Sequence, residues 1–148
     1  MRPIEKLIVH CAATKPSMNI GATEIRQWHL ANGWSDIGYN YVIRRDGVVE
    51  NGRDLDRDGN VDEEIGAHAK GFNARSIGIC MVGGLDQAGW PAPEFTEAQF
   101  TALNGLLAGL RIRYPGAEVL GHRDLPGVAK ACPSFDVRHW LATGKVRP

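Results

Sequence analysis

Three side chains of types that bind metals or act as nucleophiles stand out in this chain: His10, His122 and Cys132. Cys132 lies in the stretch GHRDLPGVAKACPSFD, residues 121–136, shortly after Lys130. A nearby ammonium group favours the thiolate, and a thiolate serves either as a nucleophile or as a metal ligand. Two imidazoles and one thiolate suit Zn²⁺, and three protein ligands leave a fourth tetrahedral position for water, as in catalytic zinc sites. The residues alone leave both roles open for Cys132.

Each of these residues also has a plain structural interpretation. A single histidine in a strand is more often a buried structural residue than a ligand, and a single cysteine is commonly a small apolar side chain. The spacing of the three donors lacks the local regularity of a zinc finger. Isolated residue types therefore do not decide the function, and the elements that carry them have to be considered.

Two of the donors fall on predicted strands. The apolar run of residues 7–13 predicts a short buried strand that carries His10, and residues 118–122 predict another that ends at His122. Side chains alternate between the two faces of a strand, so Cys11 is expected to face away from His10 and to belong to the core. Rigid elements would thus hold both histidines.

The remaining pattern predicts a single α/β domain, residues 1–148, with a central mixed β-sheet flanked by helices. Residues 39–45 alternate and are followed by Asp46-Gly47, which predicts a β-hairpin. The run at residues 76–82, which contains Cys80, predicts a central strand buried on both faces. Three helices are predicted, at residues 23–31, from the capping box Thr96–Gln99 to before Pro115, and at residues 135–143.

Length and charge narrow the class of protein. A chain of 148 residues, 43% hydrophobic, is long enough to bury one core. The 17 basic and 17 acidic residues balance, so no net field recruits nucleic acid or an anionic membrane. The sequence has neither a signal-peptide pattern nor an apolar run of membrane-spanning length, which predicts synthesis in the cytosol without membrane insertion. An odd set of three cysteines in that reducing compartment argues against a disulfide framework.

Four segments resemble the zinc-dependent N-acetylmuramoyl-L-alanine amidases of the type 2 family, which includes phage endolysins and peptidoglycan recognition proteins. They are VHCAATKPS, EIRQWHLANGWSDIGYNYVIRRDGVVENGR, GAHAKGFNARSIGICMVGG and GHRDLPGVAKACPSFD, in the family's order. The likeness covers most of the chain and is closest to the small single-domain phage lysozymes that act as amidases. The loop between His122 and Lys130 is slightly longer than in those lysozymes, which leaves its conformation open.

The resemblance implies that His10, His122 and Cys132 bind Zn²⁺ and that Tyr39 and Lys130 lie in the active site. Amide hydrolysis needs an activated water and stabilisation of the oxyanion that forms as the carbonyl becomes tetrahedral. Lys130 is then expected to stabilise the oxyanion, and Tyr39 to orient water or substrate and to assist proton transfer. The alternatives are a solvated lysine and a core tyrosine. The resemblance favours the role of metal ligand for Cys132.

The resemblance further implies a substrate and a biological setting. His68 and Asn73, in GAHAKGFN, match positions that line the substrate groove, although a structural role in the loop is an equal alternative for His68. The expected substrate is peptidoglycan, cut between N-acetylmuramic acid and L-alanine by a monomeric endolysin. The protein is expected to stay in the host cytoplasm until a holin-like partner gives it access to the cell wall. His29 and His139 are interpreted as surface or packing residues.

The acidic stretch DLDRDGNVDEE, residues 54–64, looks inserted relative to the phage lysozymes. It resembles the start of an EF-hand calcium loop with glycine at the sixth position, and its oxygen donors would be Asp54, Asp56, Asp58, Asn60 and Asp62. The twelfth position is Ile65 rather than a glutamate, so Glu63 or Glu64 would have to substitute. A Ca²⁺ site and a solvated acidic turn both remain open.

Two other functions are compatible with parts of the pattern. A recognition module without activity would bind muropeptides in the same groove, but binding-only members of the family tend to lack the cysteine that Cys132 supplies. A cysteine peptidase built on Cys132 and His122 would leave His10 and Lys130 without roles. We therefore expect an enzyme that loses its activity when its metal is removed.

Overall fold

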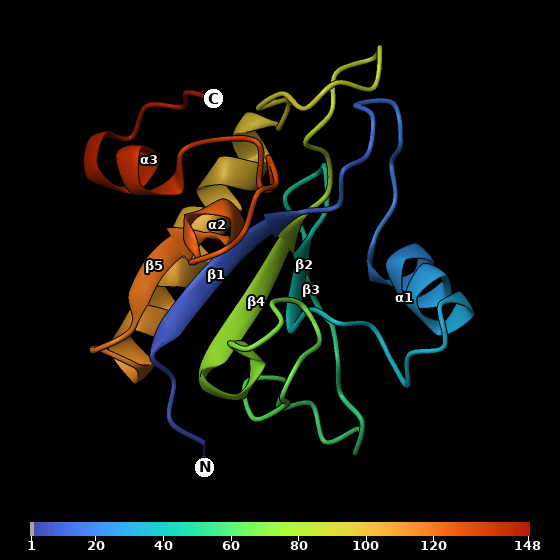
Figure 1. The fold of residues 1–148 in the computed structure, drawn as a ribbon, viewed down its shortest axis with the longest axis vertical. Coiled ribbons are helices and arrows are strands. Elements are labelled where there is room, and N and C mark those ends of the chain that lie inside the picture. The colour runs from blue at the N-terminus through green and yellow to red at the C-terminus, as the bar shows by residue number, and fades with distance from the viewer. Residues whose placement is uncertain (1) are drawn as a thin grey trace.

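The computed structural model describes residues 2–148 and builds them around a five-stranded sheet (Figure 1). The sheet has the order β3-β2-β4-β1-β5, with β1 Lys6–Cys11, β2 Tyr41–Ile43, β3 Val49–Asn51, β4 Ser76–Met81 and β5 Glu118–Gly121. β1 pairs in parallel with both β4 and β5, and β2 pairs in parallel with β4. β2 and β3 pair antiparallel as a hairpin, so the predicted mixed sheet and hairpin are confirmed.

The two central strands, β4 and β1, are buried on both faces. All residues of β4 are buried, and so are those of β1 after Lys6. Parallel strands covered on both sides have near-continuous apolar sequences, as LIVHC and SIGICM do here. His10 is therefore a polar side chain placed in an otherwise apolar strand, where it needs a hydrogen-bonding or metal partner.

Helices α1 Ala22–Ala31, α2 Glu97–Arg113 and α3 Val137–Thr143 flank the sheet, and 3₁₀ turns occupy Asn73–Arg75 and His122–Asp124. The predicted capping box is present: Thr96 Oγ1 accepts from the Gln99 N–H at 3.1 Å, and Gln99 Oε1 accepts from the Thr96 N–H at 3.0 Å. The last helix begins two residues later than predicted, because the Asp136 carboxylate caps it by accepting from the His139 N–H.

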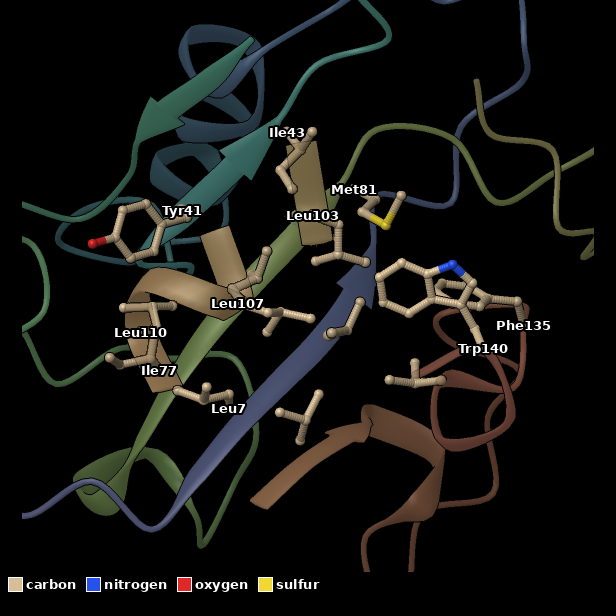
Figure 2. Packing of buried hydrophobic residues seen from close by; sticks show 14 of the residues in the cluster. Leu7, Tyr41, Ile43, Ile77, Met81, Leu103, Leu107, Leu110, Phe135 and Trp140 are labelled. Carbon is tan, nitrogen blue, oxygen red and sulfur yellow. The ribbon is translucent and has the colours of Figure 1, made fainter. Parts of the chain in front are cut away.

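One face of the sheet carries the main hydrophobic core (Figure 2). Figure 1 shows α2 behind the sheet, and its buried leucines pack on the strands: Leu103, Leu107 and Leu110. Phe135 and Trp140, from the segment that leads into α3 and from α3 itself, extend the same core. The C-terminal helix therefore belongs to the same packed unit as the sheet.

The opposite face is covered by α1 and by the long connection between β3 and β4, which lies in front of the sheet in Figure 1. Ile25 of α1 packs with Val42 and Cys80, and Ala69 of the connection packs with Ile8. His10 is two residues from Ile8 along β1 and so lies on this face. Within residues 2–148, no helix combines the length and apolarity needed to cross a bilayer.

Candidate active site

The structure brings the three predicted donors together at the carboxyl end of the parallel strands. Val9 pairs with Gly121, so His10 and His122 leave adjacent strands side by side, with ring centroids 4.5 Å apart. Cys132 returns to the same point from the loop before α3, with Sγ 3.9 Å from His10 Nδ1. One donor atom from each residue lies within 4.8 Å of the other two. The three predicted donors are therefore close enough together to hold one metal ion.

The strand that precedes His122 is one residue shorter than predicted. β5 ends at Gly121, whose N–H donates to the Asp124 carboxylate at 2.8 Å. This bond turns the chain into the 3₁₀ helix His122–Asp124. His122 therefore starts a turn rather than ending a strand, and its ring lies beside that of His10.

Burial keeps the two histidines in the neutral form that binds metals. His10 is 1% exposed, and burial lowers its pKa well below 6.5, with a smaller contribution from the positive charges that His68, His122 and Lys130 can carry. The pKa of His122 is also lowered, by burial and by Lys130. Neutral imidazole has one ring nitrogen with a free lone pair, which is the form that coordinates a cation.

Cys132 completes the donor set. The backbone N–H of Cys11 donates to its Sγ at 3.3 Å, while contact with the Cys11 thiol and burial raise the pKa of Cys132. A divalent cation at this point would reverse that balance, because a coordinating thiol is deprotonated. Two neutral imidazoles and one thiol at this separation fit Zn²⁺ and leave one coordination position for water. Cys11 and Cys80 are both buried, as predicted.

Tyr39 and Lys130 lie beside these donors. The Tyr39 ring centroid is 5.1 Å from that of His10, and the following residue, Asn40, is tied to Gly78 of β4 by backbone and side-chain bonds of 2.9 Å. Burial raises the pKa of Tyr39 well above 10, and neighbouring thiols add to the shift. The phenol therefore stays protonated and can donate a hydrogen bond. Lys130 is exposed on the wall of a groove.

This groove has a volume of about 650 Å³, and His122 is the metal donor that lines it. His68 and Asn73, the two residues predicted to contact substrate, both line it. The other lining residues include Trp34, Lys70, Phe72, His122, Leu125 and Lys130, and the whole set comes from three separate segments of the chain. Asn73 also shapes the loop itself, because its Oδ1 accepts from the N–H groups of His68 and Ala69 at 2.9 Å each.

His68 lies deeper than a simple groove residue. It is 9% exposed, its Nδ1 is 2.8 Å from His10 Nε2, and its Nε2 is 3.3 Å from Ser76 Oγ. Burial lowers its pKa to about 3, with the charges of His122 and two arginines as further causes. Both of its ring nitrogens have protein partners.

Sequence reasoning missed one residue next to this site. The sequence predicts a surface or packing role for His29, but its Nδ1 accepts from the Gly38 N–H at 2.9 Å and its ring centroid lies 5.6 Å from that of Tyr39. It thereby holds the turn that leads into Tyr39. Its partner is a backbone group, so nothing in the local sequence pattern predicts the bond. His139 lies half-buried on α3.

In the acidic loop, the carboxylates of most of the acidic residues lie close together. Carboxylate oxygens of Asp54, Asp56 and Asp58 lie within 4.8 Å of one another, and those of Asp56, Glu63 and Glu64 form a second such group. The prediction that Asp62 is a donor to Ca²⁺ is wrong. Its buried carboxylate instead accepts from hydroxyl and guanidinium groups that fix the loop to the body of the protein: Tyr41, Arg113 and Tyr114. The Asn60 side chain reaches only Glu63, at 3.5 Å.

Comparison with known proteins agrees with this geometry. A family model described as N-acetylmuramoyl-L-alanine amidase matches residues 1–135. The chain is 49% identical over 141 residues to an endolysin of Enterobacteria phage K11, covering 95% of this chain and 87% of that protein. It is 48% identical over 136 residues to the endolysin of Escherichia phage T7, covering 92% and 84%.

Solved structures of amidases and peptidoglycan recognition proteins have a similar fold. The N-acetylmuramoyl-L-alanine amidase LysC from Clostridium intestinale URNW superposes with a TM-score of 0.76 at 26% identity, over 97% of this chain and 85% of that one. Bumblebee PGRP-SA superposes with a TM-score of 0.71 at 26% identity, over 97% and 83%. With a family match over most of its length and the family's fold, the chain belongs to the N-acetylmuramoyl-L-alanine amidases.

Proposed function

We propose that the protein is a zinc-dependent endolysin that hydrolyses the amide bond between N-acetylmuramic acid and L-alanine in peptidoglycan. The observation that carries this proposal is the convergence of His10, His122 and Cys132 next to a groove that His122 and Lys130 line. The family match and the endolysin relatives support both the reaction and the substrate. Zn²⁺ is the cofactor that the donor set favours.

The three donors would hold the metal through two neutral ring nitrogens and one thiolate. When bound, zinc lowers the pKa of its water to about 7 and polarises the carbonyl of the scissile amide. The chain supplies the rest of the site. The buried position of His10 at the end of β1 and the turn at His122 fix the ligand geometry, and the groove aligns the substrate amide with it.

Lys130 and Tyr39 are the groups of the chain that we assign to the reacting amide. The Lys130 ammonium stabilises the negative charge that develops on the carbonyl oxygen in the transition state. The Tyr39 phenol, kept protonated by burial, donates a hydrogen bond that orients water or substrate and assists proton transfer to the leaving amine. His68 and Asn73 shape the groove wall where muramic acid and the stem peptide are expected to bind.

The biological setting follows from the relatives. Because the chain covers 84–87% of the length of the phage endolysins given above, we infer the same role in host-cell lysis. Residues 1–148 act as one catalytic domain, since α3 packs into the core beyond the matched region. The enzyme works as a monomer, stays in the host cytoplasm until a holin-like partner opens the membrane, and then reaches the cell wall.

The first experiment is hydrolysis of purified peptidoglycan by metal-stripped protein, with and without added Zn²⁺, followed by mass analysis of the products. We expect free stem peptides that begin with L-alanine, released only when zinc is restored. His10→Ala and Cys132→Ser should abolish this release because each removes a donor. His139→Ala, a histidine on α3 outside the donor cluster, is the matched control and should keep full activity.

Three results would contradict the proposal. Tight muropeptide binding with intact amide bonds at saturating zinc would identify a recognition module instead. Activity that survives chelation, and is lost in Cys132→Ser, would identify a cysteine peptidase. Wild-type activity in a metal-free Cys132→Ser protein would exclude the zinc mechanism outright.

A further inference from the structure

We propose that His68 is a positioning residue for the metal site: it fixes the tautomer and the ring orientation of His10 and anchors both rings to Ser76. This inference rests on the zinc proposal above and concerns a residue that would not itself touch the metal. It replaces a direct substrate contact as the main role of His68.

The hydrogen-bond directions along this chain of residues follow from metal binding at one end. His10 Nδ1 faces Cys132 Sγ at 3.9 Å, so Nδ1 is the nitrogen that would coordinate, and the ring proton must then lie on Nε2. Nε2–H donates to His68 Nδ1 at 2.8 Å. His68 in turn carries its proton on Nε2 and donates to Ser76 Oγ at 3.3 Å. Each ring nitrogen has one defined role.

The His68 ring is held by the fold independently of any metal. A Cβ atom at Gly78 would lie 2.5 Å from the ring, so the imidazole rests directly on the backbone of β4 where only glycine leaves room. Asn73 Oδ1 accepts from the His68 N–H at 2.9 Å and fixes its backbone. The His68 and His10 rings meet edge to face at 87°, with centroids 4.9 Å apart. The acceptor for His10 is thus rigid before a ligand binds.

A rigid acceptor behind a metal-binding histidine has a known physical effect. It selects the coordinating tautomer, removes rotational freedom from the ring and raises the basicity of the ligand nitrogen. Loss of such a partner typically weakens metal binding about 10- to 100-fold. His68 can exert this effect on His10, whereas both of its ring nitrogens are already engaged and unavailable to a substrate.

The test measures zinc affinity by competition with a chromogenic chelator, for wild type and for two matched variants. His68→Phe keeps the aromatic ring and removes both nitrogens, so we expect about 10- to 100-fold weaker zinc binding. His68→Asn returns an acceptor oxygen near the former Nδ1, and we expect it to recover most of that loss. Folding of each metal-free variant is checked by circular dichroism at the temperature used, so that affinities are compared between folded proteins.

Two further measurements test the proposal even if a His68 variant fails to fold. Gly78→Ala leaves His68 in the sequence but displaces its ring, and should also weaken zinc binding. Nitrogen NMR of the imidazoles in zinc-loaded wild type requires no substitution and should find His10 protonated at Nε2. A His10 protonated at Nδ1 would overturn the proposal.

Zinc affinity of His68→Phe within twofold of wild type would also overturn it, and a rise in KM alone would then assign His68 to the substrate. Failure of the underlying zinc proposal gives a different result. In that case the wild-type protein itself would bind no zinc in the chelator assay, whatever residue stood at position 68.

Discussion

Lys130 and Tyr39 lie beside the metal donors but are not themselves donors. Substitutions at these two residues can therefore change the rate of hydrolysis without changing metal binding. Lys130→Met should lower kcat about 10²- to 10³-fold, as loss of an oxyanion-stabilising group does, and leave zinc content unchanged. Turnover is measured on labelled peptidoglycan and zinc by atomic spectroscopy. Lys70→Met, which removes another lysine from the same groove, is the matched control and should affect kcat far less.

Tyr39→Phe tests the hydroxyl group alone, because the ring and its packing beside His10 are retained. We expect a loss of roughly 10²-fold in kcat, at the lower end of what proton-transfer groups contribute. Unchanged turnover would make Tyr39 a packing residue. An equal loss of bound zinc would instead indicate that the hydroxyl supports the donors.

Between the regular elements, the acidic loop 54–64 contains six carboxylates in eleven residues. Two overlapping groups of carboxylates share Asp56, and carboxylate oxygens are the ligands that Ca²⁺ takes in proteins. The Ca²⁺ loop stays a prediction. Added Ca²⁺ should raise the melting temperature measured by calorimetry, and Asp56→Ala should remove the rise while Glu94→Ala, outside the loop, keeps it. Equal melting temperatures with and without Ca²⁺ would leave a solvated acidic turn.

Protonation in this loop gives an independent test. A hydrogen bond with the Asp58 carboxylate, together with partial desolvation and the negative charge of Asp58, raises the pKa of Glu63 from 4.5 to about 7. The folded protein then binds more protons than the unfolded chain between these values, so the stability contributed by Glu63 is complete below pH 4.5 and is lost as pH rises through 7. Carbon NMR of the Glu63 carboxyl should give a midpoint near 7. A midpoint near 4.5 would show that the carboxylates do not interact.

Helix α2 carries the main core, and its contribution is measurable by one truncation. Leu107 is 1% exposed against the sheet, so Leu107→Ala should lower the free energy of unfolding by about 2–5 kcal/mol in urea titrations. Ile112 in the same helix is 82% exposed, and Ile112→Ala should change it by less than about 0.5 kcal/mol. Similar effects of the two substitutions would mean that α2 does not pack as described.

At the level of the whole molecule, the sequence predicts features with local causes and misses those created by distant partners. The capping box at Thr96 and the hairpin at Asp46-Gly47 depend on residues that are close together in the sequence, and both are present. The metal donors could be found because their residue types are informative and family segments surround them. Asp62 could not be assigned, since its partners Arg113 and Tyr114 lie far away along the chain.

The same limit applies to the supporting histidines. The role of His68 depends on a parallel pairing that puts Ser76 at the start of β4 and leaves the His68 ring over Gly78. His29 bonds to a backbone group that no side-chain pattern marks. Residue types therefore predict which groups do chemistry, whereas the packing of the whole sheet decides which groups hold them.

The position of β1 between β4 and β5 bears on how the protein is made. Of the five strands of the sheet, β1 is synthesised first, and its two parallel partners begin at Ser76 and Glu118. Contacts between residues so distant in sequence form late and slowly, because long loops must close first. A nascent chain that lacks residues 118–132 has neither a complete sheet nor a complete donor set. Folding and lytic competence should therefore arise together, only after residues 118–132 have been synthesised.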